Sequence, residues 1–327
     1  MRILVTGGAG YIGSFIVRAL KDAGFEPYIV DNLSTGHREA VKGFPLAKID
    51  LVTEEEKLDE LFTEEKFTGV IHMAAFIQMG ESYENPGMYF RNNVVGSLNL
   101  LEVMVKHGVS NFVFSSSAGV YGEPESLPIK EEDLKNPANP YGETKLMVER
   151  MLFWFDKAHD LKFMSIRYFN AAGAALDGSI GSDQPNESHL IPNALTAALK
   201  GEEFTLFGGD YKTADGTCVR DYIHVLDLAD THALALKALT KGAKSNFYNA
   251  GQGKGYSNEQ VVEMIKKVTS LDFKVKIGPR RSGDTASLVA SIDKIKKDLG
   301  WKPKYGLEEI VESAYKWHKS HPHGYAG

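Results

Sequence analysis

Residues 2–13 read RILVTGGAGYIG, a short apolar run that passes directly into a glycine-rich turn. Read from Gly8, the turn fits the pattern G-x-G-x-x-G, with Gly10 and Gly13 as its other glycines and Gly7 adding slack. Between a strand and a helix, such a turn lets the backbone approach a pyrophosphate, whose charge the amides at the helix N-terminus bind. The stretch therefore predicts a parallel α/β fold whose first turn binds a dinucleotide.

Asp31 supports the same prediction. It closes the apolar run PYIVD at 27–31 and follows Gly10 by 21 positions, near the roughly 20 typical of the acid that binds the adenosine ribose. A carboxylate there repels a 2′-phosphate, and no arginine directly follows it, so the pattern favours NAD over NADP. The alternative interpretation is a glycine turn that only joins strand to helix, with Asp31 as a loop cap.

Further apolar runs at 69–74 and 111–117, separated by helix-length stretches, predict a doubly wound parallel sheet. After about Ala172 a glycine-rich stretch leads to a helix near 191–201 and a strand at 204–208, which indicates a smaller second lobe. We expect a Rossmann-type NAD-binding domain over 1–170, which the chain rejoins around 221–250. We expect residues 171–327 to form a smaller C-terminal α/β substrate-binding lobe.

Composition narrows the function classes. The chain has 327 residues with a net charge of −6 and no block of like charge, which argues against a nucleic-acid partner. No apolar run approaches the roughly 18 residues of a membrane span, and the strand at Arg2 leaves no room for a signal core. The single Cys218 excludes an internal disulfide and a thiolate metal cluster, and we expect it to be a small packed residue. We therefore expect a cytoplasmic protein without a bound metal.

The stretch NPYGETK at 139–145 predicts a helix that starts at Pro140 with Asn139 as its cap. Tyr141 and Lys145 then lie one turn apart on the same face. For the phenol to act as a base, its pKa of about 10 must fall by roughly three units, and the Lys145 ammonium and an oxidised nicotinamide would both lower it. Serines 115–117 end a predicted strand at the edge where ligands bind. The alternatives are a solvated helix face and serines that only form a turn.

Seven stretches, spread over nearly the full length, resemble the extended short-chain dehydrogenase/reductase family and, within it, the nucleotide-sugar 4-epimerases. They read VTGGAGYIGS, DNLS, FSSSAGVYG, NPYGETK, IRYFNAAGA, DGTCVRDYIHVLDLAD and PRRSGD. The resemblance implies that Ser117, Tyr141 and Lys145 are catalytic. It implies a cofactor set of Gly7, Gly10, Tyr11, Ile12, Gly13, Asp31, Asn32, Asp50, Leu51, Asn92, Ser115, Tyr141, Lys145 and Phe169. It implies a substrate set of Ser117, Tyr141, Asn170, His189, Phe207, Arg220, Tyr222, Arg281 and Asp284.

The same resemblance implies reversible C4 epimerisation of UDP-glucose and UDP-galactose. The C4 hydride would pass transiently to tightly bound NAD through a 4-keto sugar, and the chain would form a homodimer through the Tyr141 helix and residues 93–106. Arginines suit phosphates and Asp284 suits ribose hydroxyls, although Arg220-Asp221 could be a surface ion pair and Arg280-Arg281 a solvated basic pair.

The sequence disfavours two rival reactions and one rival class of protein. Dehydratases of nucleotide sugars place an acid pair after the serine, where this chain has Ala118 and Gly119. Enzymes of UDP-glucuronate would need a further cation for the sugar carboxylate. A scaffold that had lost its chemistry would be expected to lack a member of the triad.

Three positions depart from the family pattern. Ile77 stands where many members have a lysine beside the cofactor, and His189 where some have asparagine. Leu288 falls on a wall of the sugar pocket and is intermediate between the bulky residue associated with simple hexoses and the small one associated with N-acetylated sugars. Activity on UDP-N-acetylhexosamines is therefore left open.

Overall fold

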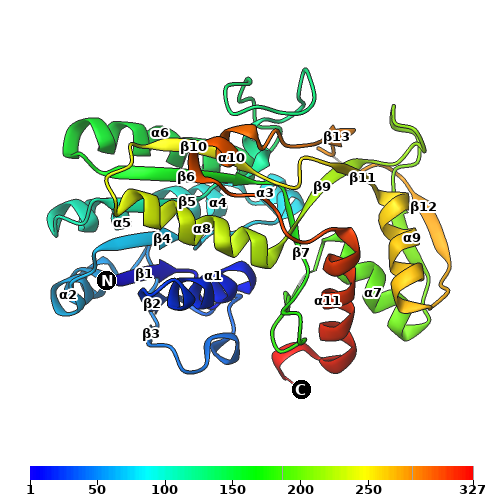
Figure 1. The fold of residues 1–327 in the computed structure, drawn as a ribbon, viewed down its shortest axis with the longest axis horizontal. Coiled ribbons are helices and arrows are strands. Elements are labelled where there is room, and N and C mark those ends of the chain that lie inside the picture. Colours follow the sequence, from blue (N-terminus) through cyan, green and yellow to red (C-terminus); the bar gives the residue numbers. More distant parts are fainter. Residues whose placement is uncertain (186, 282, 327) are drawn as a thin grey trace.

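The computed structural model describes residues 1–185, 187–281 and 283–326. Seven parallel strands form its main sheet, in the order β10-β6-β5-β4-β1-β2-β3 (Figure 1). This arrangement confirms the predicted Rossmann-type class. The strands are β1 (Arg2–Thr6), β2 (Glu26–Val30), β3 (Leu46–Ala47), β4 (Gly69–His72), β5 (Asn111–Ser115), β6 (Lys162–Tyr168) and β10 (Asn246–Ala250).

Helices cover both faces of this sheet, which explains why its strands are continuous apolar runs. On one face α1 and α8 lie side by side (Figure 1), and α2, α5 and α6 pack on the other. Ile3, Leu4 and Val5 are completely buried between the two layers, and each such side chain contributes about 1.5–3 kcal/mol by leaving water. The helices are α1 (Tyr11–Asp22), α2 (Glu55–Glu65), α3 (Met79–Glu84), α4 (Pro86–Tyr89), α5 (Gly96–Lys106), α6 (Pro140–His159), α8 (Val225–Leu239) and α10 (Asp293–Leu299).

Three predicted strands end earlier than expected. β2 stops before Asp31, β4 stops at His72 and β5 stops at Ser115. In each case the last residues of the apolar run leave the hydrogen-bonded ladder at its carboxyl edge. The predicted runs were therefore too long because their final residues belong to the loops that form the candidate site.

Smaller sheets and a separate helical core make up the other side of the molecule (Figure 1). β9 pairs with β11, β13 and β7, β12 pairs with β8, and helices α7, α9 and α11 enclose a third hydrophobic core. The elements are β7 (Asn170–Ala172), α7 (Leu190–Lys200), β8 (Phe204–Phe207), β9 (Val219–His224), β11 (Gly255–Ser257), α9 (Asn258–Thr269), β12 (Val275–Gly278), β13 (Ser287–Leu288) and α11 (Leu307–Ser320). The division into domains 1–170 and 171–327 stays a prediction.

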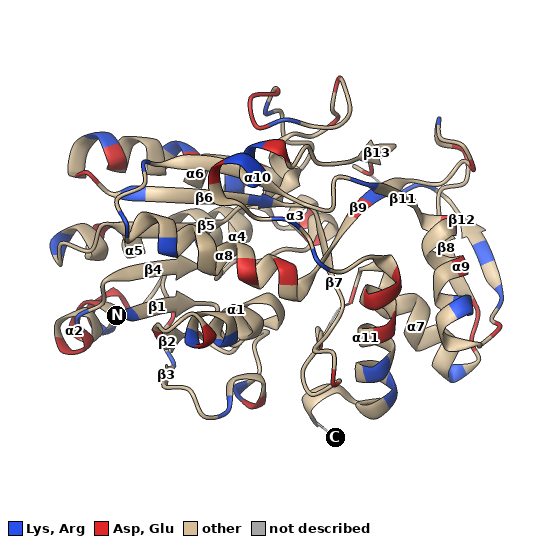
Figure 2. Cartoon of the chain, viewed as in Figure 1, with Lys and Arg blue, Asp and Glu red and all other residues tan. Residues whose placement is uncertain are grey.

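Short helical turns complete the chain: η1 (Arg38–Val41), the π-helical η2 (Phe90–Val95), η3 (Ala118–Val120) and η4 (Gly324–Ala326). Basic and acidic residues are interspersed over helices and loops on both sides (Figure 2). Within the described part of the chain, no helix is long and apolar enough to cross a membrane.

Candidate active site

A cleft opens at the carboxyl edge of β1, β2 and β4, and most of the predicted cofactor residues lie along it. Those that line it are Gly7, Gly10, Tyr11, Ile12, Gly13, Asp31, Asn32, Asp50, Leu51 and Asn92. Ile77 lines the cleft as well, with an apolar side chain where a lysine would offer an ammonium. Carboxyl edges of parallel strands are where open α/β sheets bind ligands.

The glycine turn leaves no room for side chains. Gly7 has a φ of +69°, and a Cβ there would lie 2.6 Å from the backbone nitrogen of Ala74. A Cβ on Gly13 would lie 2.2 Å from the Gly7 carbonyl oxygen. Gly8 lies against Ile29. Gly7, which was predicted to add slack to the turn, takes the left-handed conformation at which glycine is favoured. The N-cap of α1 is Gly10, which has no side chain to cover the first-turn amides.

Asp31 is fixed at the end of this cleft by backbone donors. The Ala9 amide donates to its Oδ2 at 3.0 Å and the Leu33 amide donates to its Oδ1 at 2.8 Å. Burial raises the pKa of this carboxyl, and the two amides offset part of the increase. A glycine cradle without side chains, open helix amides and a strand-end acid together fit a dinucleotide such as NAD.

The predicted start of α6 is confirmed, and it brings Tyr141 to the serine loop. The Asn139 side chain accepts from the Gly142 amide at 2.8 Å, with Pro140 in the first turn. A Cβ on Gly142 would lie 2.5 Å from the Gly119 carbonyl oxygen, so this glycine allows the helix to approach the loop after β5. Ser117 lies in that loop, and its Oγ accepts from the Gly119 amide at 3.0 Å. Its hydroxyl proton is therefore available for another acceptor.

Tyr141 is buried and hydrogen-bonds with Ser117 and with Tyr168. Burial raises the pKa of the phenol, and these hydrogen bonds offset only part of the increase. Desolvation therefore penalises the phenolate more than these neighbours stabilise it, and the expected lowering of the pKa by Lys145 and an oxidised nicotinamide stays a prediction.

Lys145 lies one turn further along α6, also buried. Its Nζ donates to the Ser115 carbonyl at 2.8 Å and lies 5.9 Å from the centre of the Tyr141 ring. Burial lowers the pKa of Lys145 to about 7, although Glu149 one turn beyond raises it in part.

Ser115, Tyr141, Lys145 and Phe169 do not line the cleft, although all four were predicted to bind the cofactor. Phe169 is buried in the core beneath α1 and α8. The His232 ring of α8 lies with Nδ1 2.9 Å from the Leu228 carbonyl and Nε2 2.6 Å from Ser115 Oγ. Since a carbonyl only accepts, Nδ1 donates and Nε2 accepts from the serine. Ser115 is thereby oriented towards the protein interior, and its carbonyl positions Lys145.

Sequence reasoning missed Tyr168 and His232. Tyr168 lines the cofactor cleft and contacts Tyr141, and its signal was its place inside the motif IRYFNAAGA. No local signal marks His232, whose partner Ser115 is 117 positions away.

The predicted substrate residues gather around β9. Asn170 on β7 stands opposite Tyr222 in the parallel ladder, and Leu288 on β13 stands opposite Arg220. Arg220 lies 3.5 Å from Asp284, so its partner is this carboxylate and the alternative of an Arg220-Asp221 surface pair is wrong. Asp221 is fully buried and accepts from the backbone amides of residues 252, 253 and 290. Figure 2 shows both signs of charge on β9.

A second group of predicted substrate residues lies next to the group around β9, in the turn that carries Asp284. The Arg281 guanidinium stacks 4.2 Å from the Phe207 ring centre and donates to the Ser188 carbonyl, beside the exposed His189. Arg280 instead stacks on Tyr211 and pairs with Asp210 at 2.6 Å. The two arginines are therefore held apart by separate aromatic partners, unlike a pair that is only solvated. Cys218 is buried and free, as expected.

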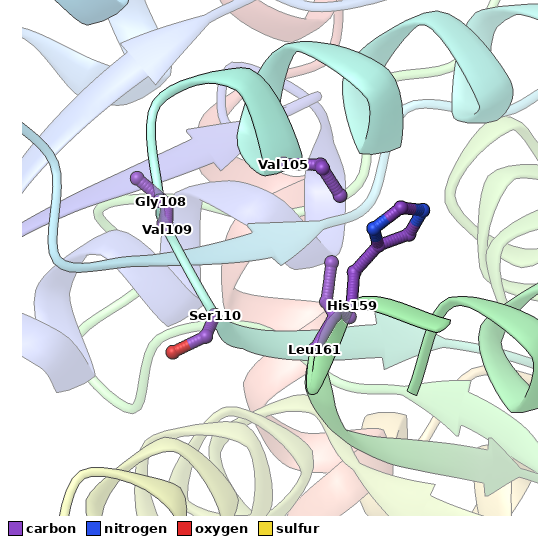
Figure 3. Close-up of a pocket in the computed structure, with 6 residues that line it drawn as sticks. All are labelled: Val105, Gly108, Val109, Ser110, His159 and Leu161. Atoms are coloured by element: carbon purple, nitrogen blue, oxygen red, sulfur yellow. The ribbon is translucent and has the colours of Figure 1, made fainter. Parts of the chain in front are cut away.

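A hollow also lies at the opposite, amino edge of β5 and β6. It is lined by Val105, Gly108, Val109, Ser110, His159 and Leu161, and the His159 ring turns towards Val105 (Figure 3). None of the predicted site residues lies in it. In the described ranges, no group of three or more His, Cys, Asp or Glu side chains could hold a metal ion.

Comparison with known proteins places these residues in context. Residues 3–251 match the model of the NAD dependent epimerase/dehydratase family. A UDP-glucose 4-epimerase of Halalkalibacterium halodurans is 49% identical over 328 residues, which covers 100% of this chain and 98% of the relative.

Two solved structures are similar along the whole chain. A crystal structure of a UDP-glucose 4-epimerase superposes with a TM-score of 0.96 at 47% identity and covers 99% of both chains. The Bifidobacterium longum UDP-glucose 4-epimerase in complex with NAD⁺ and UDP has a TM-score of 0.94 at 35% identity, covering 99% of this chain and 100% of its own.

Proposed function

Because this chain belongs to the NAD dependent epimerase/dehydratase family, as its motifs predicted, we propose that it interconverts UDP-glucose and UDP-galactose by inversion at C4. The observation that carries the proposal is the position of Tyr141. Its phenol contacts Ser117 and also Tyr168, which lines the cofactor cleft. Two residues after Tyr168, Asn170 joins the β9 group of substrate candidates. Tyr141 therefore lies where a cofactor and a nucleotide sugar would meet.

The triad residues divide the proton chemistry among them. Tyr141 removes the proton of the 4-hydroxyl, while the Ser117 hydroxyl hydrogen-bonds the reacting oxygen. Bound NAD⁺ supplies the acceptor for the C4 hydride, its return to the 4-keto sugar, and a positive charge that favours the phenolate. Lys145 contributes its own charge from below the Tyr141 ring.

The β9 group holds the part of the substrate that does not react. Arg220 and Arg281 bind the diphosphate, Asn170 contributes an amide, and Asp284 accepts from ribose hydroxyls. Binding energy spent on UDP keeps the keto sugar from escaping while it turns its other face to the cofactor. The experiment is product analysis after incubation with UDP-galactose, with UDP-glucose as the expected product. Absence of conversion, with or without added NAD, would reject the proposal.

A second activity, on UDP-N-acetylhexosamines, depends on Leu288, whose side chain is intermediate in size. This side chain stands opposite Arg220 on β13, beside the substrate group. We propose that UDP-N-acetylgalactosamine is a slower substrate than UDP-galactose. Parallel incubations measure the ratio of kcat/KM for the two sugars, and Leu288→Tyr should lower the rate only with the acetylated one.

We also propose a cytoplasmic homodimer. Phe153 and Trp154 on α6 are 47% and 67% exposed and stack edge to face. Burying both rings against a second copy across α5 and α6 would remove this apolar surface from water. Light scattering should give twice the chain mass for the wild type and a smaller mass for Trp154→Glu. A monomeric wild type would reject the dimer.

A further inference from the structure

Residues 183–185 lie across the end of the cofactor cleft that Asp31 lines. Asp183, Gln184 and Pro185 line the cleft together with Ser34 and Thr35, which follow β2. Together with Gly181 and Ser182 before it, this segment forms the strap (residues 181–185), part of the long connection between β7 and α7. It therefore meets the loop after β2 from the opposite wall of the cleft.

One side of the strap is joined to that loop by His37. The imidazole Nε2 lies 2.9 Å from the Asp183 carbonyl oxygen, to which it donates, and 3.4 Å from Asp183 Oδ2. The contact spans 146 residues of sequence. This contact connects the two walls of the cleft at the end that Asp31 lines.

The other side is held by the last residues of the chain. The Tyr325 amide donates to Asp183 Oδ2 at 2.9 Å, and its hydroxyl donates to the Gly181 carbonyl at 3.3 Å. The Trp317 indole of α11 donates to the Ser182 carbonyl at 2.9 Å. Each residue of 181–183 therefore accepts at least one hydrogen bond from α11 or from the residues after it.

Residues 321–325 are closely packed against Asp183 and against neighbouring aromatic rings. Gly324 has a φ of +63°, and a Cβ there would lie 2.1 Å from Asp183 Oδ2. The Tyr325 ring packs between Trp317, at 4.8 Å between ring centres, and His37, at 5.0 Å. His321 stacks on Trp317 at 3.9 Å. The segment is thus fitted to the Asp183 carboxylate and to its neighbours.

We propose that residues 321–325 are a latch that fixes the strap over the cofactor cleft and sets how slowly NAD leaves. The latch also addresses a problem of charge, because an unpaired Asp183 carboxylate in the cleft wall would repel a pyrophosphate. The Tyr325 amide and His37 both contact Oδ2 of that carboxylate, so it is not unpaired. The inference rests on the proposed function in one respect: an enzyme that regenerates NAD in every turnover benefits from never releasing it.

The test compares two glycines that share a backbone conformation. Gly324→Ala places a methyl group against Asp183, whereas Gly300→Ala pays the same left-handed strain, at a φ of +67°, with nothing within 4 Å. Each protein is purified with NAD bound and mixed with excess isotope-labelled NAD, and the exchange rate is followed by desalting and mass spectrometry. We expect about tenfold faster exchange in Gly324→Ala, equivalent to ~1.4 kcal/mol. Gly300→Ala should match the wild type.

Tyr325→Phe is the milder second variant, since it removes only the two hydrogen bonds of the hydroxyl, one donated to the Gly181 carbonyl and one accepted from the Gly181 amide. It should exchange NAD faster than the wild type even if Gly324→Ala does not fold. Equal exchange rates in all folded variants, or a wild type that retains no NAD through purification, would overturn the latch. Slow exchange without conversion of UDP-galactose would leave the latch standing and reject the epimerase instead.

Discussion

In the cofactor cleft the ligand-facing positions are largely backbone held by glycines, whereas around β9 they are long charged side chains paired with one another. Gly7 and Gly13 have no space for a side chain. Arg220, by contrast, lies 3.5 Å from Asp284, and Arg281 is exposed on Phe207. The first half is shaped before any ligand arrives. Under the proposed function, the second half would exchange internal contacts for contacts to a diphosphate.

Tyr141 stands where the two halves meet, and its replacement should have the largest effect. Loss of the base in Tyr141→Phe is expected to lower kcat by roughly 10³-fold, within the 10²–10⁴ typical of acid-base catalysis. The NAD content should not change, because the cleft itself is intact. Tyr315→Phe on α11 is the control. A Tyr141→Phe protein with full activity would remove this residue as the base.

Gly13→Ala tests whether the cofactor half depends on backbone shape. The new Cβ would meet the Gly7 carbonyl at 2.2 Å, and overpacking of this kind costs about 1–3 kcal/mol. We expect the protein to purify without NAD and to unfold at lower denaturant concentration. Gly80→Ala, which has nothing within 4 Å, should behave as the wild type. Full NAD content in Gly13→Ala would contradict the account of the turn.

Replacing Arg281 and Arg280 in turn distinguishes a loss of substrate binding from a loss of surface charge in the half around β9. Loss of a charged hydrogen bond costs about 1.5–3 kcal/mol, so Arg281→Ala should raise KM for UDP-galactose by roughly 10–100-fold. Arg280→Ala, which loses its pairing with Asp210, should change KM little. Equal effects of the two variants would mean that Arg281 has no special contact with the substrate.

As the pH falls, buried histidines in the cofactor half should lower the free energy of unfolding, whereas a buried aspartate in the half around β9 should raise it. Burial lowers the pKa of His72 to about 3 and of His232 to about 4, both beside the cofactor strands. These histidines contribute stability that is complete above about pH 6.5 and is lost as the pH falls towards 4. Burial raises the pKa of Asp221 on β9 to about 6, so its contribution is complete below about pH 3.8 and is lost as the pH rises through 6.

Urea unfolding between pH 7 and 4.5 measures both contributions. In His232→Gln the loss of stability towards acid should be shallower, by about 1.4 kcal/mol per pH unit. In Asp221→Asn it should be steeper, because an opposing gain has been removed. An unchanged slope in both variants would contradict the sign of these shifts.

Local sequence signals predicted the features that local geometry determines. The glycine turn, the strand-end Asp31 and the Asn139-Pro140 start of α6 are set by residues within a few positions of each other. The strap and the orientation of Ser115 depend on partners more than 100 positions away. The pKa of Tyr141 could not be predicted from its spacing to Lys145, because burial in the folded chain raises it.

The most direct test of the proposed chemistry follows the hydrogen on C4. UDP-galactose carrying deuterium at C4 is incubated with the purified protein in ordinary water, without added NAD, and the product is examined by NMR. The account predicts UDP-glucose that retains deuterium at C4, because the hydride returns to the carbon it left. Deuterium lost to water, or no product with or without NAD, would contradict it.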